Sequence, residues 1–129
     1  MPIHQEISIN AAPDAVYGVL TSSADFTKMT GGRAAKISKE AGGEVSLFGG
    51  DIQARNIELK PGKRVVQAWR SQAWPEGVYS IVRFELAADG KGTRVTFDQA
   101  GYPKEAHDML DGGWQQMYWG PLNAMFGGK

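Results

Sequence analysis

The sequence predicts an α+β fold of the helix-grip type, in which a curved antiparallel sheet wraps around one long C-terminal helix. Apolar and polar residues alternate through residues 3–9 and through most of residues 33–99, a period of two that is typical of strands. Helical spacing of apolar residues governs residues 104–126. A long antiparallel sheet curls, and its concave face must be covered by an apolar element. The C-terminal helix is the only predicted element long enough to do so.

The opening residues predict one strand followed by two short helices. Residues 3–9 alternate as expected for a half-buried strand. A helix opens at Pro13 and Asp14, because proline is tolerated in a first turn and aspartate favours the positive end of the helix dipole. A second short helix is expected over residues 25–29.

The middle of the chain predicts about six further strands, giving a sheet of about six to seven. Seventeen of the 129 residues are glycine, nearly twice the usual ~7%, and pairs such as Gly42-Gly43 mark tight turns. A change of phase after Ala54 predicts a β-bulge near Arg55-Asn56. The expected strands cover residues 33–39, 44–48, 51–59, 64–72, 78–87 and 93–98.

The C-terminal segment predicts a kinked helix that packs across the concave face of the sheet. Pro121 is expected to produce the kink, because proline removes a backbone donor and crowds the preceding turn. Trp114 is expected to be largely buried against the sheet. The apolar stripe that defines the helix comprises Leu110, Trp114, Met117, Tyr118, Pro121, Leu122, Met125 and Phe126.

Composition favours one globular domain over residues 1–129 in a reducing, cytoplasmic setting. The chain is 42% hydrophobic and 22% charged, near the globular average, and it has no cysteine. Lysine and arginine balance aspartate and glutamate at 14 each, so no field of one sign favours nucleic acid or an anionic membrane. No apolar run is long enough to span a bilayer.

Three segments of the chain resemble a known family, the activators of heat-shock protein 90 ATPase. The first is similar to the WR…WPEG stretch of the C-terminal domain of those activators, and the second to their GW…Y…FG helix. The third matches the opening motif of the wider START-like (Bet v-like, SRPBCC) superfamily. The segments are residues 65–77, residues 112–122 closing on Phe126-Gly127, and residues 7–17.

The resemblance implies the same helix-grip fold, a chaperone ATPase as a possible partner and a small apolar molecule as a possible ligand. In the eukaryotic activators a separate N-terminal domain makes the main chaperone contacts. This chain begins at the C-terminal-type domain, so we expect it to stimulate a chaperone ATPase weakly or not at all by itself. Either a monomer or a homodimer is compatible with the resemblance.

The sequence lacks the constellations that catalysis requires. The two histidines are His4, in the first strand, and His107. His107 with Asp108 and Asp111 is a poor zinc set, and we interpret these residues as a solvated helix start whose acids favour the dipole. No G-x-S-x-G, H-E-x-x-H or P-loop motif occurs, and the glycine pairs flank hairpins. We therefore expect no metal, no nucleotide and no cofactor.

Eight residues are candidates for the wall of a ligand cavity between the sheet and the C-terminal helix, with a filled core as the alternative. Strict alternation turns Gln67 inward, where its amide needs a partner because an unsatisfied buried amide is costly. That partner is a ligand, unless a small bulge turns Gln67 outward. The candidates are Gln67, Trp69, Val82, Phe84, Phe97, Trp114, Met117 and Tyr118.

The loop Trp74-Pro75-Glu76-Gly77 is a second candidate site. A large aromatic residue on a loop is either a binding anchor, with Trp74 and Glu76 contacting a partner, or a lid over the open end of the grip. Arg70 is expected on the outer surface, paired with Glu85 or Glu76.

These observations favour a non-enzymatic binding module that resembles the chaperone regulators. Its first rival is a START-like carrier of a small hydrophobic ligand. Its second rival is a cyclase or hydrolase in which Gln67, Tyr79 or Tyr118 supplies polar groups. The scarcity of titratable residues in the expected cavity argues against the enzyme.

Overall fold

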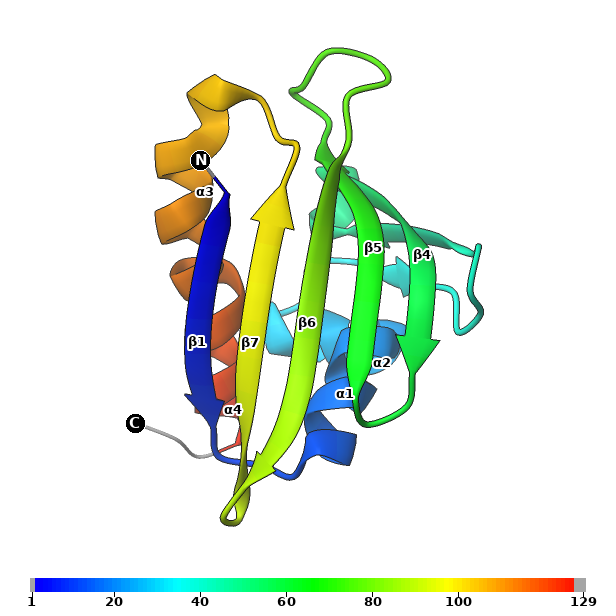
Figure 1. Ribbon diagram of the computed structural model, residues 1–129. Coiled ribbons are helices and arrows are strands. Elements are labelled where there is room, and N and C mark those ends of the chain that lie inside the picture. Colours follow the sequence, from blue (N-terminus) through cyan, green and yellow to red (C-terminus); the bar gives the residue numbers. More distant parts are fainter. Residues whose placement is uncertain (1, 127–129) are drawn as a thin grey trace.

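A computed structural model describes residues 2–126, which form a helix-grip with seven strands in one antiparallel sheet (Figure 1). The strand order is β1-β7-β6-β5-β4-β3-β2. The helices lie behind the sheet in this view, on one face. The strands are β1 (Ile3–Ile9), β2 (Lys36–Ile37), β3 (Glu44–Leu47), β4 (Ile52–Lys60), β5 (Arg64–Ser71), β6 (Ser80–Asp89) and β7 (Gly92–Ala100). The helices are α1 (Pro13–Thr21), α2 (Ser23–Met29), α3 (His107–Trp114) and α4 (Gly120–Met125), with single turns η1 (Phe48–Gly50), η2 (Lys104–Ala106) and η3 (Gln115–Trp119).

Alternation along the central strands sorts side chains onto two faces, as the sequence predicts. In β6, Val82 and Phe84 are buried while Ile81 and Arg83 are exposed. Phe84 lies opposite Phe97 of β7, with ring centroids 5.1 Å apart. The inward side chains of the sheet and the apolar faces of the helices make one core. The predicted fold class is confirmed.

The predicted bulge in β4 is present one residue further along the chain. The register between β4 and β5 shifts between Asn56 and Glu58. Asn56 is thereby buried, and its side-chain amide donates to the carbonyl oxygens of Ser38 at 2.8 Å and Glu40 at 3.3 Å. The bulge therefore fastens the outer hairpin of the sheet to its centre.

The strand expected over residues 33–39 is shortened to β2, Lys36–Ile37. Side chains of the second helix and its C-terminal end take the backbone donors that a longer strand would use. The backbone N–H of Arg33 donates to Thr30 Oγ1, that of Ala35 to Thr27 Oγ1 and that of Ile37 to Ser23 Oγ. Local side-chain bonds of this kind compete with strand pairing.

The C-terminal helix changes its winding where the sequence predicts a kink at Pro121. Residues Gln115–Trp119 form a π-helical turn between α3 and α4, and the Gly120 N–H donates to the Gln115 carbonyl five residues back. Proline cannot donate and clashes with the turn before it, so a wider turn upstream accommodates it. A π-helical turn contains one residue more than an α-helical turn, and here the neighbouring residues Tyr118 and Trp119 are both buried. No helix within residues 2–126 is long and apolar enough to cross a membrane.

Candidate functional site

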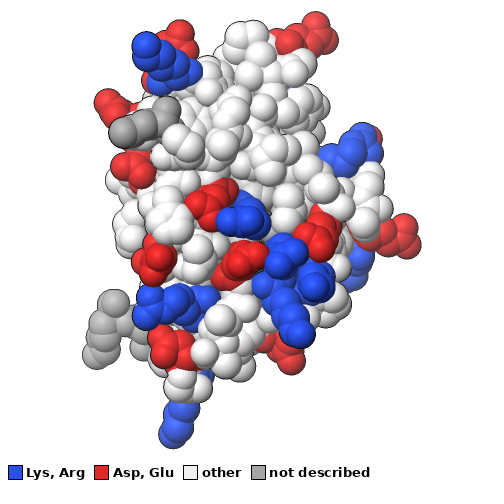
Figure 2. Space-filling model, viewed as in Figure 1, with Lys and Arg blue, Asp and Glu red and all other residues white. Residues whose placement is uncertain are grey.

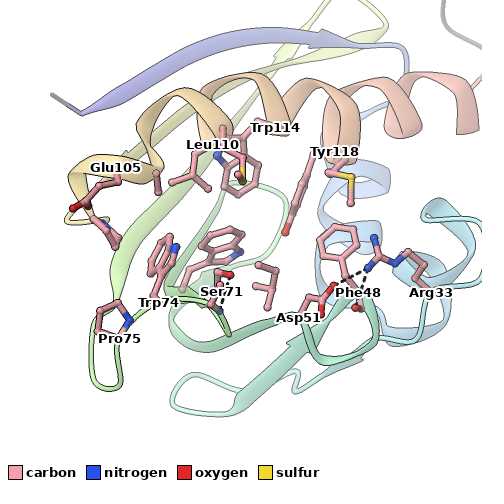
Figure 3. A pocket seen from close by; sticks show the side chains of 18 residues that line it. Arg33, Phe48, Asp51, Ser71, Trp74, Pro75, Glu105, Leu110, Trp114 and Tyr118 are labelled. Atoms are coloured by element: carbon pink, nitrogen blue, oxygen red, sulfur yellow. Dashed lines mark hydrogen bonds and ion pairs between the residues drawn. The ribbon is translucent and has the colours of Figure 1, made fainter.

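An apolar pocket of about 600 Å³ lies between the C-terminal helix and the sheet (Figure 3). Its roof is the helix, from which Leu110, Trp114 and Tyr118 hang into the space. Strand β5 supplies the floor through Trp69 and Ser71. The pocket lies in the region where the sequence predicts a cavity or a filled core, and further walls come from loops.

Aromatic rings make up most of the inner wall. The ring of Trp69 lies 5.2 Å from that of Trp114 and 5.9 Å from that of Trp74, the latter edge-on. At the other end Phe48 and Tyr118 meet edge-on at 5.9 Å. Such edge-on and tilted contacts are the arrangements that aromatic side chains prefer. The pocket thus presents ring faces and edges to anything that enters it.

Phe48 reaches the pocket through an uncommon backbone conformation. The strand expected over residues 44–48 ends at Leu47, and Phe48 has a φ of 53°, in the left-handed region. Few non-glycine residues adopt this region, and they concentrate at functional sites. Here the conformation turns the chain at the end of β3 and lets the Phe48 ring pack against Phe26 and Tyr118.

The loop that carries Trp74 is tied to the sheet by Arg70. The Arg70 guanidinium donates to the carbonyl oxygens of Trp74 at 2.7 Å, Pro75 at 3.2 Å and Val78 at 3.2 Å. The expected pairing of Arg70 with Glu85 or Glu76 is wrong, because its guanidinium is engaged by these carbonyl oxygens and Glu85 pairs with Arg64 at 2.8 Å. Trp74 and Pro75 line the pocket.

The opposite end of the pocket is electrically neutral. Arg33 donates to Asp51 Oδ2 at 3.0 Å and to the Phe48 carbonyl at 3.3 Å, and it lies 5.1 Å from the centre of the Phe48 ring. Both charged side chains are substantially exposed. Since each charge is already paired, this end offers no free charge to a ligand.

A chain of hydrogen bonds between uncharged groups connects Trp114 to Trp69. The Trp114 Nε1 donates to Gln99 Oε1 at 2.8 Å, and Gln99 Nε2 donates to Ser80 Oγ at 3.0 Å. The Ser80 hydroxyl donates in turn to the Trp69 carbonyl at 2.8 Å. Gln99 and Ser80 are fully buried, and neither was among the predicted site residues. Alternation from Phe97 onward would have turned Gln99 inward and indicated its role.

Four of the eight predicted cavity residues line the pocket, and four lie beside it in the core. Trp69, Trp114, Met117 and Tyr118 belong to the lining. The four that lie outside the lining are Gln67, Val82, Phe84 and Phe97, all buried. Of the two loop candidates, Trp74 lines the pocket while Glu76 is exposed and lies outside the lining.

Gln67 does point inward, as strict alternation requires. Its Nε2 donates to the Asn56 Oδ1 at 3.2 Å, and both amides are buried. The partner that a buried amide needs is therefore supplied by the bulge in β4. Long-range pairing across two strands provided a partner that the local sequence did not reveal.

Two polar groups in the lining are the Trp69 indole and the Tyr118 phenol. Burial raises the pKa of Tyr118 far above its ordinary value, and the nearby Trp69 indole N–H acts in the opposite direction. The two side chains nevertheless fall short of hydrogen-bond geometry, and Trp69 Nε1 has no partner among the described residues. His107 lies outside this pocket beside Asp108. Within residues 2–126 no three His, Cys, Asp or Glu side chains gather as a metal site would require.

Comparisons with known proteins agree with the resemblance seen in the sequence. The family described as "Activator of Hsp90 ATPase homolog 1-like protein" has a sequence model that matches residues 10–127. A relative from Dictyostelium discoideum, an activator of 90 kDa heat shock protein ATPase homolog, is 41% identical over 78 residues, which are 60% of this chain and 20% of that protein. The segments matched in the curated relatives cover between 20% and 34% of their lengths.

Solved structures show the same fold. An HSP90 activator from Plasmodium falciparum superposes with a TM-score of 0.92 at 21% identity, over 98% of this chain and 96% of that one. The solution structure of the Aha1 dimer from Colwellia psychrerythraea gives a TM-score of 0.83 at 20% identity, over 100% of this chain and 98% of that one. With the family model matching nearly the whole chain, the protein belongs to the activator of Hsp90 ATPase homolog 1-like family.

Proposed function

We propose that this protein is a non-enzymatic binding module whose pocket takes one small apolar molecule. The observation that carries the proposal is an aromatic pocket of about 600 Å³ between the sheet and the C-terminal helix. Small-molecule sites are typically ~300–1,000 Å³, mostly apolar, with a few placed polar groups. Binding in such a site is driven by burial of apolar surface, at roughly 25 cal/mol per Å².

The neutral end of the pocket favours an uncharged ligand. Arg33 is already paired with Asp51, so an anion would enter an apolar space without gaining a free cation. Burying a charge without a partner is strongly unfavourable. Met117 adds a flexible side chain to the lining, and methionine adapts to irregular shapes. We therefore expect modest selectivity among flat or aliphatic neutral molecules.

Titration with N-phenyl-1-naphthylamine, a neutral fluorescent probe, tests this proposal. Wild-type protein is expected to bind the probe saturably near one per chain and to lose tryptophan emission. Met117→Trp should block binding by filling the space. Ile81→Trp is the matched control, because Ile81 lies on the outer face of β6 and is 47% exposed. Absence of saturable binding, with Met117→Trp strongly destabilising the fold, would contradict the proposal and indicate a packed core.

The family match supports a second role, the regulation of an Hsp90 ATPase in the cytoplasm. The segments shared with the curated activators are at most about a third of their lengths. We therefore expect the purified 129-residue chain to stimulate a cognate Hsp90 weakly or not at all. Strong stimulation in a steady-state ATPase assay would contradict this expectation.

A pull-down on immobilised Hsp90, combined with the probe titration, separates a chaperone regulator from a simple carrier. A regulator is expected to bind immobilised Hsp90 in a pull-down, and Trp74→Ala on the pocket loop should weaken that binding if the loop is an anchor. A carrier would bind N-phenyl-1-naphthylamine equally well but would show no Hsp90 binding. Met117→Trp then reveals whether the two activities depend on each other.

A further inference from the structure

One buried polar atom in the pocket stands apart from its neighbours. Of the buried side-chain nitrogen and oxygen atoms in the described residues, only Trp69 Nε1 has no hydrogen-bond partner. The other two buried tryptophans are satisfied: Trp114 Nε1 donates to Gln99 and Trp119 Nε1 donates to Gln5, at 2.8 and 2.7 Å. Buried polar groups are almost always paired, so an exception requires an explanation.

A second polar atom lies beside it. Tyr118 comes from the π-helical turn and points from the roof of the pocket toward the floor (Figure 3). Its side chain is buried, and the Trp69 N–H is the neighbour that influences its hydroxyl. A hydroxyl hydrogen rotates to suit its acceptor, and an indole N–H only donates. Both groups are able to donate, and they are neighbours in the lining of the pocket.

We propose that Trp69 Nε1 and Tyr118 Oη form a subsite for an oxygen acceptor on a neutral, planar aromatic ligand, such as an aromatic ketone or a quinone. This inference rests on the proposed function of the pocket and specifies the chemistry of its ligand. The ligand's oxygen would accept from the indole and from the phenol. Its ring system would lie among Trp69, Trp114 and Phe48.

Other classes of ligand fit the pair less well. A ligand that can only donate would leave the Trp69 N–H unsatisfied, which is costly in an apolar surrounding. A carboxylate or phosphate would bring a charge next to aromatic rings, and Arg33, which lies against the Phe48 ring near Tyr118, is already paired with Asp51. A pure hydrocarbon fills the space but leaves the indole without a partner. A neutral carbonyl oxygen satisfies both donors without a buried charge.

The test compares two probes that differ only by a carbonyl group, 9-fluorenone and fluorene. Equilibrium dialysis measures their dissociation constants for wild-type protein, Tyr118→Phe and Trp69→Phe. Each variant removes one donor and keeps an aromatic ring. Tyr79→Phe is the matched control, because Tyr79 is 48% exposed and lies outside the pocket lining. Thermal unfolding of each variant confirms that it is folded.

The expected result is a selective loss. Tyr118→Phe should weaken 9-fluorenone binding roughly fivefold while fluorene binding changes less than about twofold, as for one neutral hydrogen bond. Trp69→Phe alters the floor as well, so the ratio of the two affinities is the relevant quantity and should fall by a similar factor. The infrared carbonyl stretch of bound 9-fluorenone should lie at a lower wavenumber in wild-type protein than in Tyr118→Phe.

Each alternative outcome is decisive. Equal losses for both probes, or none, would overturn the subsite while the pocket proposal stands. That outcome would mean that Trp69 and Tyr118 satisfy each other in solution. Failure of wild-type protein to bind either probe would overturn the pocket proposal and the subsite together.

Discussion

The two faces of the sheet differ in how their polar groups are satisfied. On the outer face, charges of both signs intermix over the lower half in the view of Figure 2. Arg83 pairs there with Asp98 at 2.9 Å, and Arg94 with Glu6 at 3.1 Å. The buried polar side chains beneath the concave face are uncharged, and the Trp69 N–H has no partner among the described residues. On the outer face opposite charges pair with each other, whereas the concave face has one buried hydrogen-bond donor, the Trp69 N–H, without a partner among the described residues.

The two faces differ in this way because one is exposed to water and the other is buried. Exposed ion pairs compete with water and are worth roughly 0–1 kcal/mol each, so the outer face contributes solubility more than energy. Buried hydrogen bonds have no water to replace a lost partner, and a broken one costs about 1–3 kcal/mol. We therefore expect substitutions on the concave face to dominate both stability and binding.

The largest effect is expected for Trp114→Ala. Trp114 is 2% exposed, and its ring centroid lies 4.2 Å from that of Phe97. Removing a buried tryptophan costs roughly 3–5 kcal/mol in the free energy of unfolding, to be measured by urea denaturation. Met109→Ala is the control on the same helix, because Met109 is 81% exposed. A loss below ~1 kcal/mol for Trp114→Ala would contradict the packing of the C-terminal helix against the sheet through Trp114.

The next effect is expected for Gln99→Leu. The substitution keeps the approximate size of the side chain but leaves Trp114 Nε1 without its acceptor and Ser80 Oγ without its donor. We expect a loss of about 1–3 kcal/mol in the free energy of unfolding. Gln115→Leu, at an exposed position, should change stability by less than ~0.5 kcal/mol. Equal effects of the two substitutions would show that the buried chain of hydrogen bonds is unimportant.

A smaller effect on stability, but a clear one on binding, is expected for Arg70→Lys. Lysine keeps the charge but cannot reach three carbonyl oxygens with the planar fork that Arg70 uses. The Trp74 loop should loosen, and N-phenyl-1-naphthylamine should dissociate several-fold faster in stopped-flow experiments. Arg94→Lys on the outer face serves as the control. Unchanged dissociation would mean that the loop does not cover the pocket.

The smallest effect concerns the pH dependence of the outer face. When protonated, His4 donates from Nδ1 to Asp98 Oδ1 at 2.6 Å and from Nε2 to Glu6 Oε2 at 3.2 Å, and these bonds raise the pKa of His4 above its ordinary value. A raised pKa means that the folded state favours the protonated imidazole. The stabilisation is therefore full below the unfolded pKa of about 6.5 and is lost as the pH rises through the higher folded value.

Thermal unfolding of wild-type protein and His4→Gln at pH 5.5 and 8.5 measures this contribution. At pH 5.5, where Asp98 and Glu6 remain ionised, the unfolding temperature of the wild type should be slightly higher than that of the variant. This difference in unfolding temperature should shrink at pH 8.5. A difference that grows with pH would contradict the assigned direction.

Alternation and helical spacing were enough to predict the sheet, its two faces and the helix that covers it. They predicted that Trp69 and Gln67 point inward and that Trp114 and Tyr118 pack on the sheet, because these placements depend only on the period of the backbone. Four of the eight candidate residues, Trp69, Trp114, Met117 and Tyr118, lie in the lining of the pocket for the same reason. Val82, Phe84 and Phe97 share the inner face, but they are buried in the core outside the pocket lining.

Tertiary structure alone decided which inward residues face a pocket and which polar groups remain open. The π-helical turn buries Trp119 together with Tyr118, and the left-handed Phe48 closes one end. Asn56 satisfies Gln67, while no described residue satisfies the Trp69 N–H. The pairing of Asn56 with Gln67 and the open Trp69 N–H depend on contacts between different elements of the fold, and local sequence carries no signal for such contacts.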